Sequence, residues 1–79
     1  MVKEKHLDEA IAAFKLNVQR YPASANAYDS LGDGFKESGQ MDQAKANYEI
    51  AVRKAMETSD PGLEAMKAKL EEASKPEAK

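Results

Sequence analysis

The 79-residue sequence contains no cysteine and no tryptophan. Without cysteine the chain can form neither disulfides nor thiolate metal sites, which fits a reducing compartment. Apolar packing alone must therefore stabilise any fold. A chain of this length buries only a modest fraction of its surface, so we expect one small domain with a thin stability margin.

Strong charge of one sign is also missing, since 12 basic and 14 acidic residues give a formal net charge of -2. This balance lacks the positive field that nucleic acid or anionic lipid requires, so we exclude both as partners. No apolar run approaches the roughly 20 residues of a membrane span. Residues 1–6 are polar rather than a signal segment. We expect a soluble, cytoplasmic protein, unless the parent protein is exported.

Apolar residues recur at steps of three and four, and no segment alternates with a period of two, which predicts an all-α fold. Pro22 ends the first helix, Ser24 caps the second, Gly39 ends it, and Asp60 with Pro61 opens the last. The predicted helices span about residues 5–21, 24–38, 41–57 and 61–74, and residues 75–79 are predicted to be a disordered tail. Short connections predict antiparallel hairpins between sequence neighbours.

The fourth predicted helix is amphipathic. Its apolar positions are Leu63, Met66, Leu70 and Ala73, and we assign Glu64, Lys67, Lys69, Glu71 and Glu72 to the opposite, polar face. A helix that is apolar on one side only is expected to act as a cap on the helices before it.

A shift of 34 residues aligns the first predicted helix with the third. Identical residues recur at Asp8/Asp42, Ala10/Ala44, Ala12/Ala46 and Val18/Val52, and similar ones at Leu7/Met41, Phe14/Tyr48, Leu16/Ile50 and Arg20/Lys54. The sizes of the apolar side chains and the positions of the polar ones both recur after 34 residues, which indicates an internal helical repeat.

This pattern resembles the tetratricopeptide repeat (TPR) over about residues 7 to 57. The matching residues are Tyr28-x2-Leu31-Gly32-x2-Phe35, then Ala44-x3-Tyr48 with Ala51, and Ala10-x3-Phe14 with Pro22. Tyr28 stands in place of the commoner tryptophan. The proline expected at Met56 is absent, so the third helix is expected to continue by about a turn toward Pro61.

The resemblance implies a single domain, residues 1–79, with the hairpins of a right-handed α–α superhelix. Residues 1–22 would supply the second helix of a partial repeat, 24–57 a complete repeat and 61–74 the cap. The small residues Gly32 and Ala44 predict close approach of the second and third helices.

The TPR resemblance implies a non-catalytic scaffold that binds a protein or peptide. In that family the first helix of a repeat lines a concave groove, which here would present Asn26, Asp29, Asp33 and Lys36. The two aspartates favour a basic partner. An ordinary solvated face is the alternative interpretation of these residues.

Solenoids usually need about three repeats, and this chain has one and a half. We therefore predict an uncovered self-association face at Leu7, Ile11 and Phe14. Homodimerisation would cover it, through face packing or helix swapping. The run from Leu7 to Gly32 also resembles helical C-terminal tails of bacterial hydrolase-like enzymes, so an appendage that stabilises or dimerises an attached enzyme is the alternative function.

No residue set predicts catalysis, a cofactor or a metal. His6, the only histidine, lies in a polar segment without a second histidine or a cysteine beside it. The serines have no assigned base and no G-x-S-x-G context. Gly32-Asp33-Gly34 falls within a helical pattern rather than after a strand, which argues against a phosphate loop. Asp29 and Asp33 lack further ligands for a cation.

Overall fold

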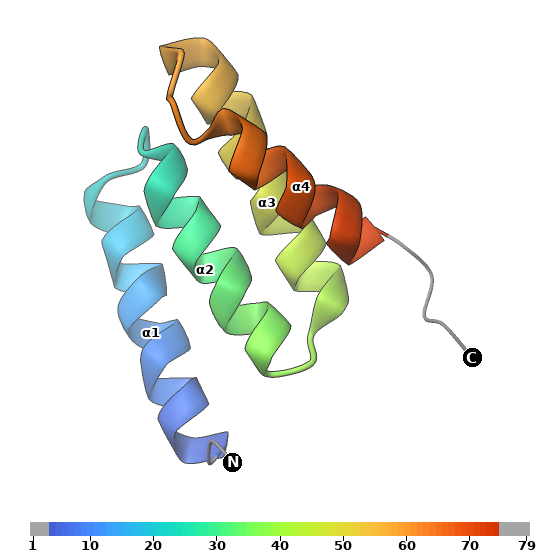
Figure 1. Cartoon of the computed structure of the whole chain (residues 1–79). Helices are drawn as coiled ribbons and strands as arrows, with labels where there is room; N and C mark the ends of the chain where they lie inside the picture. Colours follow the sequence, from blue (N-terminus) through green and yellow to red (C-terminus); the bar gives the residue numbers. More distant parts are fainter. Residues whose placement is uncertain (1–3, 75–79) are drawn as a thin grey trace.

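The computed structural model describes residues 4–74 and confirms the predicted all-α class. It contains α1 (Glu4–Arg20), α2 (Ala25–Glu37), α3 (Met41–Thr58) and α4 (Leu63–Ser74), and the described residues form no strand. The predicted tail, residues 75–79, lies outside the described residues. Successive helices run antiparallel, and each packs on the next (Figure 1).

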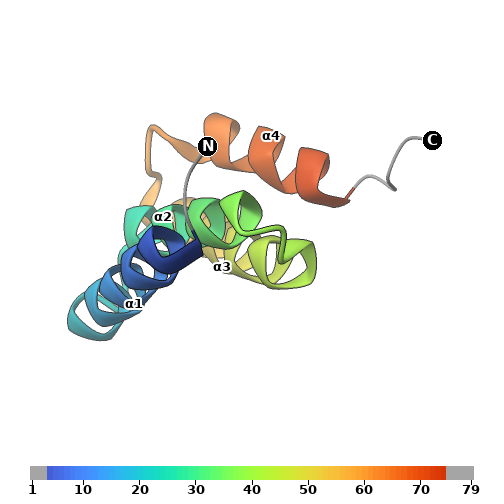
Figure 2. The ribbon, with the colours of Figure 1, turned by 90° about the horizontal axis from the view of Figure 1, so that it is seen from below.

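Helices α1, α2 and α3 lie side by side with α2 in the middle, and α4 lies across one face of the α2–α3 pair. Figure 2 shows α4 on this face, and α1 forms one lateral edge of the molecule. The arrangement follows from the short turns, which force each helix to fold back along the one before it.

The ends of α2 form as the sequence predicts. The Ser24 hydroxyl accepts a hydrogen bond from the Ala27 N–H at 3.2 Å, which satisfies one of the free N–H groups of the first turn. At the other end Gly39 has a φ of +82°, a left-handed conformation that glycine adopts without a steric penalty. The Gln40 N–H then donates to the Phe35 carbonyl at 2.9 Å and closes the helix end.

The start of α4 differs from the prediction, because the helix begins at Leu63 rather than near residue 61. Pro61 and Gly62 belong to a turn that the Asp60 carboxylate organises: its Oδ1 accepts from the Gly62 N–H at 2.7 Å. The Leu63 N–H also donates to the Asp60 carbonyl at 3.1 Å. Asp60 therefore caps a turn that precedes the helix, instead of the helix itself.

The core consists of two apolar clusters along α2 and α3. One contains Ile11, Leu31, Phe35, Ala44 and Tyr48, with Phe14, Val18, Leu70 and Ala73 packed against it. The other contains Ala25, Ala51, Ala55 and Met66, with Tyr28, Val52 and Leu63 against it. Because α4 contributes to both clusters, its apolar side is part of the core, as the sequence predicts.

Gly32 sets the spacing between α2 and α3. A Cβ atom at this position would lie 2.6 Å from two ring carbons of Tyr48, a side chain with no exposed surface. The aromatic ring therefore rests directly against the α2 backbone, as the small residue predicts. With Gly32 against α3, Asp29 and Asp33 lie where α2 also meets α4.

Candidate functional site

The predicted groove residues lie on α2 beside α4, and the centre of the site is an ammonium held between two carboxylates. Lys69 Nζ on α4 lies 3.0 Å from Asp29 Oδ2 and 3.1 Å from Asp33 Oδ2. The two aspartates are four residues apart on α2, so their side chains project from adjacent turns of one face. We call Asp29, Asp33 and Lys69 the α2–α4 seam.

Tyr48 connects the seam to the core. Its hydroxyl donates a hydrogen bond to Asp33 Oδ1 at 2.6 Å, which fixes one oxygen of that carboxylate while the other faces Lys69. Burial, and then the hydrogen bond and negative charge of Asp33, raise the pKa of Tyr48 well above its ordinary value. Tyr48 therefore stays a neutral hydrogen-bond donor and cannot serve as a base near neutral pH.

Asp29 is the more enclosed of the two carboxylates, with 13% of its side chain exposed against 46% for Asp33. Its Oδ1 atom is buried and has no hydrogen-bond partner among the described residues, although Oδ2 is paired with Lys69. A buried, unpaired carboxylate oxygen is unfavourable. Among the described residues, Asp29 therefore accepts through Oδ2 alone.

Opposing effects act on Lys69. Desolvation lowers the pKa of its ammonium group, but the hydrogen bonds and charges of Asp29 and Asp33 raise it by more, so the net pKa lies above its ordinary value. The Lys69 side chain is 36% exposed, so water screens its attraction to the two carboxylates, which is weaker than it would be in a dry interior. Lys69 is therefore a charged group that both carboxylates stabilise at the rim of the core.

The other two predicted groove residues are less engaged. Lys36 Nζ lies 3.5 Å from Glu72 Oε1, and both side chains are exposed, so this ion pair contributes little to stability. Asn26 is exposed at the start of α2. The structure thus brings Asp29 and Asp33 together, places Lys36 at the edge and leaves Asn26 in solvent.

The sequence interpretation missed the partners of these residues. We assigned Lys69 and Glu72 to the polar face of α4 that points away from the core, whereas both side chains reach α2. Lys69 borders the apolar stripe, since it lies three residues after Met66 and four before Ala73, and Glu72 lies one turn beyond Lys69 on the side of α4 that faces α2. The sequence offered one signal for these contacts: Lys69 is opposite in charge to Asp33, and Glu72 is opposite in charge to Lys36.

The predicted self-association face also needs correction. Ile11 is buried, and Leu7 and Phe14 are half-buried, because α1 turns this side toward α2. A Cβ atom on Gly34 of α2 would lie 3.0 Å from Phe14 and 3.1 Å from Ile11. The chain therefore covers most of this face itself, since α2 approaches α1 as closely as a glycine allows.

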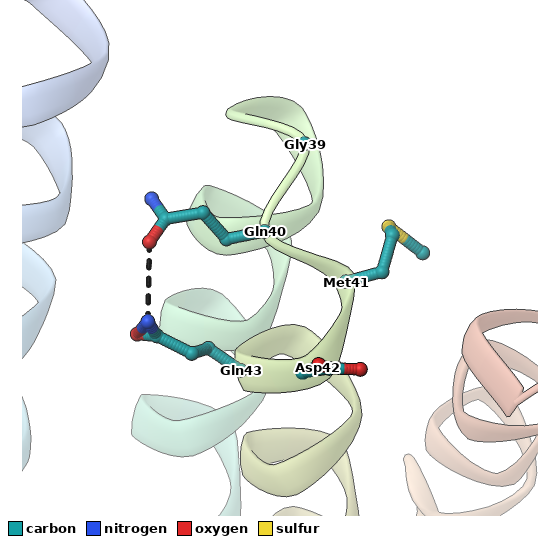
Figure 3. Close-up of a pocket in the computed structure, with 5 residues that line it drawn as sticks. All are labelled: Gly39, Gln40, Met41, Asp42 and Gln43. Atoms are coloured by element: carbon teal, nitrogen blue, oxygen red, sulfur yellow. Dashed lines mark hydrogen bonds between the residues drawn. The ribbon is translucent and has the colours of Figure 1, made fainter.

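A separate surface pocket lies at the turn between α2 and α3 (Figure 3). Its lining comes from the single stretch of residues 39–43. The side chains of Gln40 and Gln43 point to one side, where Gln43 Nε2 donates to Gln40 Oε1 at 3.1 Å, whereas Met41 and Asp42 point to the other. No second element closes this pocket, so we regard it as the surface of the turn.

Within residues 4–74, no three histidine or acidic side chains gather closely enough to hold a metal ion. None of the described helices combines the length and apolar character needed to cross a membrane. Comparison of the chain with protein-family models, curated proteins and solved structures found no match.

Proposed function

We propose that this chain is a non-catalytic protein-interaction module of TPR-like hairpins, and that Asp29 and Asp33 bind a lysine side chain of a basic partner segment. The observation that carries the proposal is the geometry around Lys69. Two carboxylates accept one ammonium at 3.0 and 3.1 Å, and Tyr48 fixes one of them. Hydrogen bonds between an ammonium and a carboxylate are roughly twice as strong as those between neutral groups.

The TPR-like part of the proposal is supported by packing. Gly32 lies against Tyr48, Ala44 is fully buried, and Tyr28 is packed against the second core cluster. These are positions at which the resemblance implies close helix contact. α4 lies across the α2–α3 pair and turns Glu64, Lys67 and Glu71 to solvent, which is compatible with the capping role that the resemblance implies.

A partner lysine would have to compete with Lys69. Because Lys69 belongs to the same chain, its effective concentration near the aspartates is on the order of millimolar. A lysine of a separate partner segment must displace it, so the segment needs further contacts to bind. Asp33 is the carboxylate that a partner can reach, since 46% of its side chain is exposed against 13% for Asp29. The resident lysine therefore lowers the apparent affinity of the site and makes it selective for segments with further contacts.

The test is a comparison of Lys69→Gln with the wild-type chain, using a fluorescein-labelled peptide with two lysines and a matched peptide with two glutamates. We expect Lys69→Gln to bind the lysine peptide about tenfold more tightly, since it removes the internal competitor. Binding should weaken between 0.05 and about 0.5 M salt, because screening acts on exposed charges.

Lys67→Gln is the matched control. Lys67 lies on the same helix and pairs only at 3.8 Å with Glu64, on the exposed side. This variant should bind as the wild type does, and Asp29→Asn in the Lys69→Gln background should abolish the gain. Circular dichroism would show that each variant is folded. A folded Lys69→Gln chain that binds the lysine peptide no better than the wild type would refute the proposed site.

A further inference from the structure

The internal repeat makes it possible to compare one face of α1 with the same face of α3. On α3, a line of residues at steps of four, three and four has no exposed surface: Ala44, Tyr48, Ala51 and Ala55. Helix α2 covers this line on one side and α4 on the other, as the two core clusters show. The face of α3 is therefore fully used within the chain.

Subtracting 34 from these numbers gives Ala10, Phe14, Asn17 and Tyr21 on α1. Ala10 and Phe14 are half-buried, Asn17 is exposed and Tyr21 is 58% exposed. The Tyr21 N–H donates to the Asn17 carbonyl at 2.9 Å, which extends the helical geometry and keeps Tyr21 in line with the others. We call these four residues the open face of α1.

The open face is distinct from the side of α1 that packs on α2. That side is centred on Ile11 and Val18, and it meets the α2 backbone at Gly34. Only Phe14 belongs to both sides: it packs against the core near Gly34 and remains partly exposed. Figures 1 and 2 show α1 at a lateral edge of the molecule, with a described helix on one side of it only. The exposure of Asn17 and Tyr21 agrees with a face that no described helix covers.

We propose that the open face of α1 binds an amphipathic α-helix of a partner protein, laid along α1 as α2 lies along α3. The established α2–α3 contact gives the chemistry of the occupant. α2 can approach the Tyr48 ring only because Gly32 has no side chain. The partner helix accordingly carries glycine where it crosses Phe14, with larger apolar residues about one turn away on either side.

Asn17 adds a requirement that the α3 contact lacks. It stands where α3 has the fully buried Ala51, so an incoming helix covers its amide. A buried amide without a partner is unfavourable, so the partner helix also carries a hydrogen-bonding side chain opposite Asn17. This polar contact distinguishes the partner from α2 itself, whose residues in the equivalent cluster are Ala25 and Tyr28.

The test uses a synthetic peptide of residues 24–38, which is the α2 sequence, titrated into the ¹⁵N-labelled chain. We expect amide shifts to change at Ala10, Phe14, Asn17 and Tyr21 and to remain unchanged on α3. Asn17→Ala makes the open face more like that of α3, and it should bind this peptide about tenfold more tightly because no amide is buried unpaired. Asn17→Arg should abolish binding.

Leu16→Arg is the matched control, because Leu16 is 52% exposed and lies outside the open face, about 100° around the helix from Asn17. It adds the same charge one residue away, and binding should not change. Asn17 and Leu16 are both exposed, so neither change removes a core contact.

Three results would overturn the proposal. One is equal binding by Asn17→Arg and the wild type. Another is a set of shifts on α3, which would mean that the peptide replaces α2. The last is concentration-dependent dimerisation through the open face without peptide, which would assign the face to a second copy. The Lys69 experiment addresses a separate surface, so its outcome does not affect this one.

Discussion

Gly32→Ala tests whether close packing or helix propensity dominates at the centre of the fold. Gly32 lies inside α2, where replacement of glycine by alanine normally stabilises a helix by about 1 kcal/mol. The new Cβ would lie 2.6 Å from Cδ1 and Cε1 of Tyr48, whereas ordinary contact begins at 3.4 Å. The two groups must therefore separate by about 0.8 Å, the difference between these two distances.

Tyr48 has little freedom to make room. Its side chain has no exposed surface, and its hydroxyl is held 2.6 Å from Asp33 Oδ1. Overpacking of such a core costs about 1–3 kcal/mol, and a weakened hydrogen bond adds about 1 kcal/mol. After the gain in propensity, we expect a net loss of about 1–3 kcal/mol in the free energy of unfolding.

Gly34→Ala is the control, because it offers the same gain in propensity on the same helix. Its Cβ would lie 3.0 Å from Phe14 and 3.1 Å from Ile11, and Phe14 is half-buried and can shift by a few tenths of an ångström. We expect its stability to lie within about 0.5 kcal/mol of the wild type or above it.

Urea unfolding followed by circular dichroism measures both variants. With a slope near 1 kcal/mol per molar, typical of a small domain, the Gly32→Ala midpoint should fall by about 1–3 M. A Gly32→Ala chain as stable as Gly34→Ala would show that the α2–α3 contact yields easily, and the packing argument would then fail.

Two further predictions concern Tyr48 and α4. Because the pKa of Tyr48 is raised in the folded state, the folded chain keeps a proton that the unfolded chain loses above pH about 10, so stability should fall as pH rises through this region. The pKa of Lys69 is also raised in the folded state, so Tyr48→Phe should reduce the loss of stability at high pH without removing it. The variant should also be less stable at neutral pH by about 1 kcal/mol, because it lacks the hydrogen bond to Asp33. If urea titrations gave the same dependence of stability on pH for Tyr48→Phe and the wild type, the assignment of this effect to Tyr48 would be wrong. Met66→Ala removes the only fully buried side chain of α4, 4% exposed, and should cost about 2–3 kcal/mol, with faster amide exchange in α4 than in α1. Met56→Ala, at a position 60% exposed, should change stability by less than about 0.5 kcal/mol, and equal effects of the two methionine variants would contradict this role of α4.

The helices and most of their ends follow from local chemistry. Apolar spacing predicts each helix, and Ser24 and Gly39 act at the ends of α2 as their side chains dictate. The exception is the start of α4, where the Asp60 carboxylate binds the Gly62 N–H and holds Pro61 in a turn. An Asp-Pro sequence can either cap a helix or form a turn ahead of it. The sequence pattern predicts a helix cap, whereas the structure has the turn.

The candidate site was predicted only in part. Asp29 and Asp33 share a helix face by their spacing, but the group that they hold is 36–40 residues away in the sequence. Which side of α4 meets α2 depends on the angle at which α4 crosses the α2–α3 pair, and helical periodicity does not contain that angle. For the same reason the sequence placed the open side of α1 at Ile11, whereas the structure leaves Asn17 and Tyr21 exposed.

By itself the sequence determined four amphipathic helices, their antiparallel order and the glycine on which the α2–α3 contact depends, because these follow from interactions within a few residues or from side-chain size. Only the tertiary structure decided that Lys69 lies between two aspartates and that, among the described residues, the exposed part of α1 is at Asn17 and Tyr21 rather than at Ile11. Both depend on how rigid helices pack against one another, and each side chain takes its neighbours from that packing.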